Sequence, residues 1–298
     1  MRKTPFDRFI FSARRAPQLW RLVLGVILIA GFSFLFTLGP IGVAWLLRGA
    51  DAALGFAREL QEPASPRAVL LLLFSFVGMA LGTALAVRLL HQRRFPSLFG
   101  PRKRVARDFA MAAGVVLMVY AVGMGLWLIQ YSPEANLAPT RWLLLLPLAL
   151  LAVAIQTGAE EMAFRGYLMQ QLAARFKSPA VWLILPALAF GAVHFDPGTA
   201  GGNVWIIVGS AALFGLVAGD LTARTGSLGA AWGFHFANNT VAILFLSTKG
   251  TITGLSLMQT PYGVDNTEVM RALLFGDLAM LLIAWAVLRR LLSPKPVA

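Results

Sequence analysis

The 298-residue chain contains no cysteine, only three histidines and few charged side chains, which make up 13% of its residues. The absence of cysteine excludes disulfides, thiolate nucleophiles and thiolate metal sites. The shortage of charge accompanies 58% hydrophobic residues and a mean hydropathy of +0.72, values that a soluble domain does not reach. We therefore expect an all-α polytopic membrane protein, because helices satisfy their own backbone hydrogen bonds in lipid.

Apolar stretches of spanning length, roughly 20 residues each, predict about eight transmembrane helices. No internal repeat divides them, so we expect a single integral membrane domain over residues 1–298. The predicted spans cover residues 20–47, 68–90, 109–131, 142–164, 179–195, 204–223, 228–247 and 272–292.

The net charge of +13 is concentrated in short segments beside the predicted spans. This placement is the positive-inside pattern, and it favours the lipid bilayer over nucleic acid as the partner. It predicts a plasma-membrane protein with both termini in the cytoplasm. His91 lies in one of these basic loops, where we expect it to be solvated. The basic residues at the two ends of the chain include Arg2, Lys3, Arg289, Arg290 and Lys295.

Ionisable groups at membrane depth are costly, so each normally has a partner, a wet cavity or a function. Glu161 and Arg165 are four residues apart, which predicts a buried ion pair on one helix face. Glu160 is turned about 100° from Glu161 on the same helix and is left without a local partner. We therefore expect Glu161 and Arg165 to have a structural role and Glu160 to be available for chemistry. Asp277 is isolated in the last span, and the sequence does not explain it.

His235 and Asn239 are also four residues apart and face one direction from a second helix, as do Phe190 and His194 on a third. A carboxylate and an imidazole can deprotonate water, while a histidine and an amide can stabilise an oxyanion. Taken singly, each group also fits a structural role, such as a hydrogen bond between helices. Taken together, they predict one polar cavity with hydrolytic chemistry, in which Phe190 packs beside the reacting groups.

Three short motifs carry a family resemblance. "EEMAFR" (160–165) fits E-E-x-x-x-R, "FGAVH" (190–194) fits F-x-x-x-H, and "HFANN" (235–239) fits H-x-x-x-N. In this order they resemble the CPBP group of intramembrane glutamic endopeptidases, which includes the type II CAAX prenyl proteases. The resemblance implies a catalytic core at residues 142–247, with additional transmembrane scaffold at 1–141 and 248–298.

The resemblance also implies a role for each motif residue. Glu160 would be the general base that activates water, and His194 would help to hold that water. His235 and Asn239 would form the oxyanion hole, and the ion pair of Glu161 and Arg165 would support the site. The implied substrate is a membrane-associated peptide or protein, with prenylated CAAX peptides as the best-known class, and no metal or other cofactor is implied.

Other functions remain open on the sequence. A zinc-dependent membrane protease would use H-E-x-x-H, which is absent, although Glu160, His194 and His235 could together ligate one zinc ion. The motifs of intramembrane serine and aspartyl proteases are absent as well. A non-proteolytic scaffold or a bacteriocin-immunity protein is the alternative outside the enzymes, since intramembrane charges also occur in such proteins.

A simple serpentine of eight spans would place Glu160 and His194 at opposite faces of the membrane. The two residues can cooperate only if the helix that carries Glu160 continues well past Arg165. We expect it to reach Arg175, with an initial break near Pro147. We also expect the span that carries His194 to stop short, so that "DPGTAGGN" (196–203) lines a cavity.

Overall fold

A computed structural model describes residues 4–292, and it confirms an all-α polytopic membrane protein with little sheet. Arg2, Lys3 and Lys295, which belong to the predicted basic ends, lie outside the described residues. Within residues 4–292, six helices are long and apolar enough to cross a membrane: Leu19–Arg48, Pro66–Leu90, Arg102–Gln130, Pro139–Arg175, Pro197–Thr225 and Thr267–Leu291.

The predicted count of eight spans is not confirmed, because two of the predicted stretches form shorter helices. The stretch at 179–195 is helical only over Ala180–Ala192, so the prediction that it stops short is confirmed. The stretch at 228–247 forms a helix up to Phe245 and then a strand. Its side chains at 229–235 are almost all buried, so this helix lies inside the bundle and needs no lipid-facing apolar surface.

The α-helices are α1 (Pro5–Phe9), α2 (Leu19–Arg48), α3 (Ala50–Gln61), α4 (Pro66–Ser75), α5 (Val77–Leu85), α6 (Arg102–Gln130), α7 (Pro139–Glu161), α8 (Gln170–Arg175), α9 (Leu185–Ala192), α10 (Pro197–Ala200), α11 (Val204–Thr225), α12 (Gly229–Thr240) and α13 (Thr267–Leu291). The 3-10 segments are η1 (Phe11–Arg15), η3 (Phe95–Leu98) and η6 (Gly201–Asn203). The π-helical segments are η2 (Ala86–Leu90), η4 (Met162–Met169), η5 (Ala180–Ile184) and η7 (Val241–Phe245). The strands are β1 (Glu134–Ala135), β2 (Leu246–Lys249) and β3 (Met258–Gly263).

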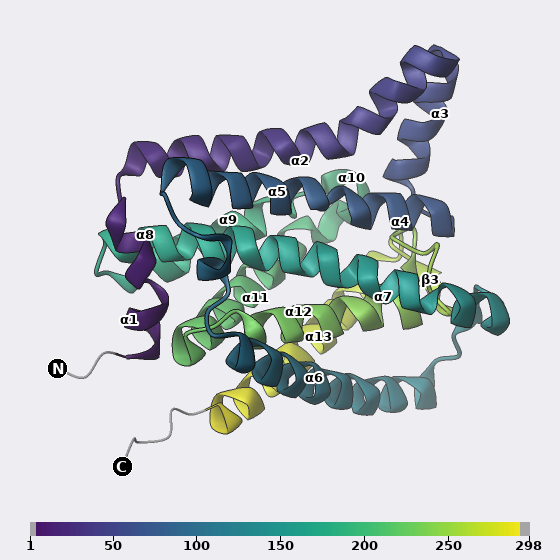
Figure 1. Cartoon of the computed structure of the whole chain (residues 1–298). Helices are drawn as coiled ribbons and strands as arrows, with labels where there is room; N and C mark the ends of the chain where they lie inside the picture. The colour runs from purple at the N-terminus through teal and green to yellow at the C-terminus, as the bar shows by residue number, and fades with distance from the viewer. Residues whose placement is uncertain (1–3, 293–298) are drawn as a thin grey trace.

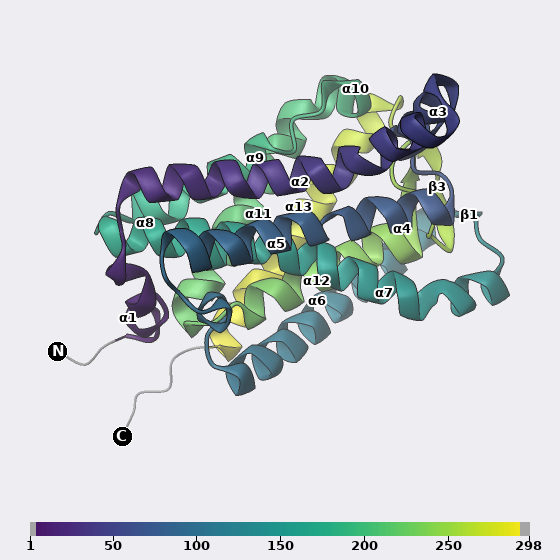
Figure 2. The same cartoon turned by 45° about the horizontal axis from the view of Figure 1, so that its top comes forward.

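The longest helix crosses the whole bundle through its middle (Figures 1 and 2). It joins α7, η4 and α8 into one run of 37 residues, Pro139–Arg175. This confirms the predicted continuation to Arg175. The predicted break near Pro147 is wrong, because α7 continues through that residue. Membrane helices tolerate an internal proline when local adjustments satisfy the backbone carbonyl that it leaves free.

Helix α12 packs closely on α6 through glycine. A Cβ atom at Gly233 would lie 2.2 Å from the carbonyl oxygen of Phe109, and one at Gly229 would lie 2.3 Å from that of Val105. Only residues without a side chain allow the two backbones to approach this closely. The contact fixes α12 between α6 and α7, and α12 carries His235 and Asn239 into the bundle.

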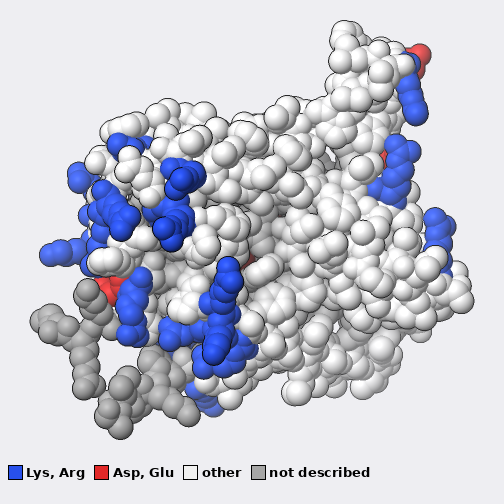
Figure 3. All heavy atoms as spheres, viewed as in Figure 1, with Lys and Arg blue, Asp and Glu red and all other residues white. Residues whose placement is uncertain are grey.

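The outer surface of the bundle is apolar, as lipid contact requires. Leu47, Ile129 and Leu144 are each at least 77% exposed. Helix α1 and the C-terminal end of α13 lie at the same end of the bundle (Figure 1), and most of the Lys and Arg visible on this face gather there (Figure 3). The three strands form a small sheet of order β1-β3-β2 at the opposite end.

Candidate active site

The ion pair predicted from the i, i+4 spacing is present. Arg165 Nη1 donates a hydrogen bond of 2.9 Å to Glu161 Oε1, and both side chains are buried. The guanidinium also lies 4.6 Å from the centre of the Phe190 ring, a cation–π contact. The helix changes from α to π geometry directly after Glu161, a local feature that is common at functional sites.

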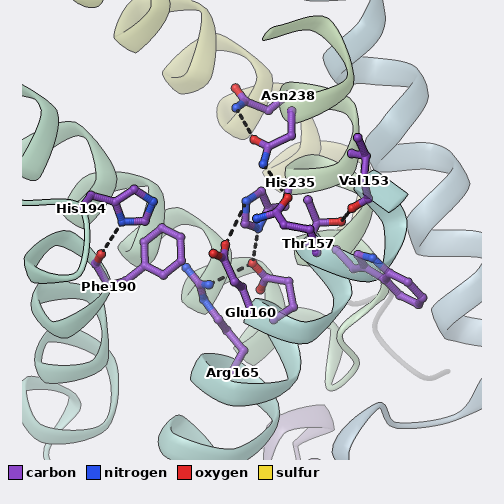
Figure 4. Close-up of polar contacts among 12 residues, drawn as sticks. Val153, Thr157, Glu160, Arg165, Phe190, His194, His235 and Asn238 are labelled. Atoms are coloured by element: carbon purple, nitrogen blue, oxygen red, sulfur yellow. Dashed lines mark hydrogen bonds and ion pairs between the residues drawn. The ribbon is translucent and has the colours of Figure 1, made fainter. Parts of the chain in front are cut away.

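His235 lies between the two glutamates. Its Nδ1 is 2.9 Å from Glu161 Oε1, and its Nε2 is 3.4 Å from Glu160 Oε2 (Figure 4). A carboxylate only accepts hydrogen bonds, so Nδ1 carries a proton and donates it to Glu161. The sequence alone did not reveal this contact between α12 and α7.

Glu160 is the less engaged of the two carboxylates. The residue is buried, with 8% of its surface exposed, and within residues 4–292 its Oε2 has no hydrogen-bond partner. The 3.4 Å separation from His235 Nε2 is longer than the usual 2.7 to 3.2 Å of such a bond. Glu161 Oε2 and Arg165 Nη2 are also buried without a partner in this part of the chain. Glu160 therefore retains a lone pair that water or a substrate can use.

His194 enters the site from the short helix α9, which ends at Ala192. Its Nδ1 donates a hydrogen bond of 2.7 Å to the carbonyl oxygen of Phe190, which leaves the lone pair on Nε2. The Phe190 ring lies between the two imidazoles, with its centre 4.7 Å from that of His194 and 6.0 Å from that of His235 (Figure 4). Phe190 thus packs beside the polar groups, and His194 faces them across its ring.

Asn239 approaches α7 one turn after His235. Its Nδ2 donates a hydrogen bond of 2.9 Å to Gln156 Oε1, and its Oδ1 accepts one of 3.1 Å from Asn238. Gln156 was not among the predicted residues, although it precedes Glu160 by four positions and therefore lies on the same helix face. A buried amide one turn before the unpaired glutamate was the signal in the sequence that could have found it.

A cavity of about 390 Å³ lies beside these amides. Asn238, Tyr120 and Asp277 form a polar part of its wall, while Thr199 and Asn203 lie on the connection 196–203. The prediction that this connection lines a cavity is therefore confirmed. Asp277, which the sequence did not explain, accepts a hydrogen bond of 2.6 Å from the hydroxyl of Tyr120.

His91 is not solvated as its basic loop suggested. It is completely buried, with Nδ1 donating 2.8 Å to the carbonyl oxygen of Ala16 and Nε2 accepting 2.8 Å from the hydroxyl of Tyr167. The basic loop folds back onto the long central helix, and this contact encloses the ring. Burial lowers the pKa of His91.

The side chains bear on the metal-binding alternative. In the described part of the chain, no three His, Asp or Glu residues are grouped as a metal site would require. The arrangement of Glu160, His194 and His235 therefore does not fit a common zinc ion.

Comparison with known proteins places the resemblance on the same segment. Residues 139–241 match the family described as "Type II CAAX prenyl endopeptidase Rce1-like". This segment contains all six predicted site residues, and the match confirms the resemblance read from the three motifs. The matched family is described as one of endopeptidases.

The chain is also similar to a bacterial protein. The chain is similar to "Uncharacterized protein YyaK" of Bacillus subtilis (strain 168), with 31% identity over 179 residues. The alignment covers 58% of this chain and 59% of that protein, which is less than two thirds of the relative's length. No solved structure matches the chain.

Proposed function

We propose that the protein is an intramembrane endopeptidase that hydrolyses a peptide bond of a membrane-associated substrate with water activated by Glu160. The observation that carries this proposal is that the two adjacent glutamates differ in their hydrogen bonds. Glu161 Oε1 accepts hydrogen bonds from both Arg165 and His235, whereas buried Glu160 Oε2 accepts none from the described residues. A carboxylate kept out of the ion pair is available as a general base.

The proposed reaction begins with a water held by Glu160 and His194. Its oxygen attacks the carbonyl carbon of the scissile peptide, while Glu160 takes its proton. The resulting tetrahedral oxyanion then collapses, and the C–N bond breaks with its electron pair on nitrogen. Glu160 returns the proton to that nitrogen, so the products are a carboxylic acid and an amine.

His235 and Asn239 are proposed to stabilise the oxyanion. Nε2 of His235, when protonated, can donate a hydrogen bond on the side that faces Glu160. Asn239 Nδ2 uses one hydrogen for Gln156 and has a second to donate. The ion pair of Glu161 and Arg165 holds the imidazole in place, because Glu161 Oε1 contacts both Arg165 and His235.

The substrate is proposed to be a peptide or protein at the membrane, with CAAX-like and prenylated C-termini included in the class. Residues 142–247 would form the catalytic core within one integral membrane domain, 1–298, with 1–141 and 248–298 as scaffold. The protein would lie in the plasma membrane with both termini in the cytoplasm, as its basic ends predict. A non-proteolytic scaffold or a bacteriocin-immunity role remains the alternative, and its test is the same.

The test compares C-terminal proteomes of membrane proteins from cells that carry the wild-type protein or Glu160→Gln. We expect specific cleaved termini to disappear in the variant, because the amide cannot accept the proton from water. Glu268→Gln is the matched control, since Glu268 is highly exposed and remote from the site. Identical termini in wild type and Glu160→Gln, with both proteins folded, would refute the proposal and favour a scaffold.

A further inference from the structure

A chain of hydrogen bonds connects Asp277 to the proposed site. The hydroxyl of Tyr120 lies 2.6 Å from Asp277 Oδ1 and 2.7 Å from Asn238 Oδ1. The side-chain amides then continue the chain, from Asn238 Nδ2 to Asn239 Oδ1 at 3.1 Å and from Asn239 Nδ2 to Gln156 Oε1 at 2.9 Å. Four contacts thus join α13, α6, α12 and α7.

The number of protons decides which way this chain is oriented. Tyr120 has one hydroxyl hydrogen, yet two acceptor oxygens lie within hydrogen-bond distance of its oxygen. If Tyr120 donates to ionised Asp277, then its own oxygen faces Asn238 Oδ1 at 2.7 Å with no hydrogen between them. If Asp277 is protonated, it donates to Tyr120, and Tyr120 donates to Asn238. The observed orientation of the amides is therefore satisfied throughout only with a proton on Asp277.

A second orientation of the amides also gives every contact of the hydrogen-bond chain one donor and one acceptor, with Asp277 ionised. Each amide would rotate by 180° and exchange its oxygen and nitrogen. Asn238 would then donate to Tyr120, Asn239 to Asn238, and Gln156 to Asn239. In this orientation the oxygen of Asn239, rather than its nitrogen, faces Gln156 on α7. One proton at Asp277 thus selects between two arrangements of the amide nearest the proposed oxyanion.

We propose that Asp277 is a positioning residue whose proton holds the amide nitrogen of Asn239 toward the reacting carbonyl. This inference rests on the proposed function, because Asn239 donates to an oxyanion only if the protein is a peptidase. Loss of the proton reverses the chain and turns an oxygen toward a developing negative charge, which opposes catalysis. Activity therefore falls as the pH rises and Asp277 ionises.

The groups around Asp277 leave its protonation as the factor that sets the orientation of the hydrogen-bond chain. Tyr120 is the only other residue in the lining of the 390 Å³ cavity with a titratable side chain. Helix α12 contributes His235, which faces the glutamates instead. On α11, Asp220 pairs with Arg289 of α13 at 3.1 Å. Arg289 lies more than three turns after Asp277 along α13, so this pair is remote from Asp277.

The remaining charges of α13 and its neighbours lie elsewhere. Glu268 and Arg271 pair with each other at 3.6 Å in the first turns of α13. Helix α6 carries no charged residue between 109 and 130, and η6 contributes Asn203. The same cavity lining includes Thr248, Thr251 and Thr260 from the sheet region, so the cavity extends from Asp277 toward that end of the bundle. Protons can reach Asp277 through this space.

Infrared spectroscopy of the full-length protein in lipid vesicles tests the protonation directly. We expect a protonated carboxyl band at neutral pH in the wild type, absent in Asp277→Asn and decreasing as the pH rises. Asp220→Asn is the matched control, because Asp220 is ion-paired and its replacement removes no such band. Identical carboxyl bands in the wild type and Asp277→Asn would overturn the inference, whatever the enzyme activity.

A cleavage assay on a peptide from the C-terminal proteome tests the consequence. Asp277→Asn can donate an N–H to Tyr120 in place of the O–H, so it is expected to keep cleavage at neutral pH and to lose the alkaline decline. Asp277→Leu cannot donate and is expected to lower kcat about tenfold or more with little change in KM. An unchanged alkaline decline in Asp277→Asn would contradict the positioning role.

The two proposals fail in different ways. If Glu160→Gln cleaves like the wild type while the carboxyl band of Asp277 is present, the proposed function fails and the hydrogen-bond chain stands. If Glu160→Gln is inactive but Asp277→Leu matches the wild type at every pH, the peptidase stands and the positioning role of Asp277 is refuted. Tyr120→Phe interrupts both orientations, so it is expected to lower kcat at neutral pH and to lack the alkaline decline of the wild type.

Discussion

His235 Nδ1 donates a hydrogen bond of 2.9 Å to Glu161 Oε1, across 74 positions of sequence. The same oxygen accepts from Arg165 on its own helix. Glu161 therefore joins a local pair to a contact between two helices, which couples the stability of the bundle to the geometry of the proposed site.

Removing Arg165 should destabilise the protein strongly. Arg165→Met leaves Glu161 as a buried charge with one less partner, and breaking such a pair costs about 3–5 kcal/mol. Unfolding of the purified protein in mixed micelles measures the loss. Arg271→Met, in a partly exposed pair with Glu268, is the control and should change little.

The double variant Glu161→Gln and Arg165→Met gives a second check on the same pair. It should be less destabilised than Arg165→Met alone, because the amide leaves no unpaired charge in the interior. A double variant as unstable as the sum of the single variants would show that the two side chains do not act as a pair.

Asn239→Ala should lower kcat by about 10²–10³-fold, because it removes one proposed oxyanion donor. KM should change little, since the interaction forms only in the transition state. Cleavage kinetics on an identified substrate measure both constants, and thermal unfolding confirms that the variant is folded. A raised KM with unchanged kcat would assign Asn239 to substrate binding instead.

Acid should destabilise the protein through His91. Burial lowers the pKa of this imidazole, with the charges of Arg93 and Arg21 acting in the same direction and the bond to Ala16 opposing them. The unfolded chain then binds more protons than the folded protein, so the free energy of unfolding falls as the pH drops below about 6.5. Equilibrium unfolding measured from about pH 7.5 to about pH 5.5 tests this slope.

His91→Gln supplies the comparison for that measurement. The amide does not titrate, so the part of the pH dependence that arises from position 91 should vanish. A slope identical to that of the wild type would place the responsible group elsewhere in the chain.

Gly233→Ala should disturb the packing of α12 on α6. The new methyl group would lie 2.2 Å from the carbonyl oxygen of Phe109, so one backbone must move, at a cost of about 1–3 kcal/mol or more. Gly114→Ala is the control, because a Cβ there meets nothing within 4 Å. Thermal unfolding of both variants measures this difference in stability. Equal stabilities would show that the close approach of α12 and α6 is not required.

The sequence predicted those features that depend on local spacing. The pair of Glu161 and Arg165 follows from one helical turn, and the continuation of that helix to Arg175 follows from the need to bring motif residues to a common level. The break near Pro147 was wrong because a local rule for soluble helices does not hold inside a membrane bundle. The count of eight spans treated every apolar stretch as lipid-facing, whereas α12 is enclosed by protein.

The individual contacts between helices could not be predicted from the sequence. The position of His235 between Glu160 and Glu161 depends on the rotation of α12, which is set by its packing on α6 rather than by its own residues. The burial of His91 depends on how a loop folds onto a distant helix. The partnership of Tyr120 with Asp277 joins residues 157 positions apart, and no spacing rule relates them.

The length of the central helix has a consequence for bilayer thickness. Its 37 residues extend about 55 Å at 1.5 Å per residue, nearly twice the roughly 30 Å of a hydrocarbon core. Such a helix must tilt or project into the headgroup region, and lipids with longer or shorter acyl chains change how far it does so. The depth of Glu160 relative to the headgroups is therefore set partly by the lipid, and acyl-chain length becomes a variable that any reconstitution has to control.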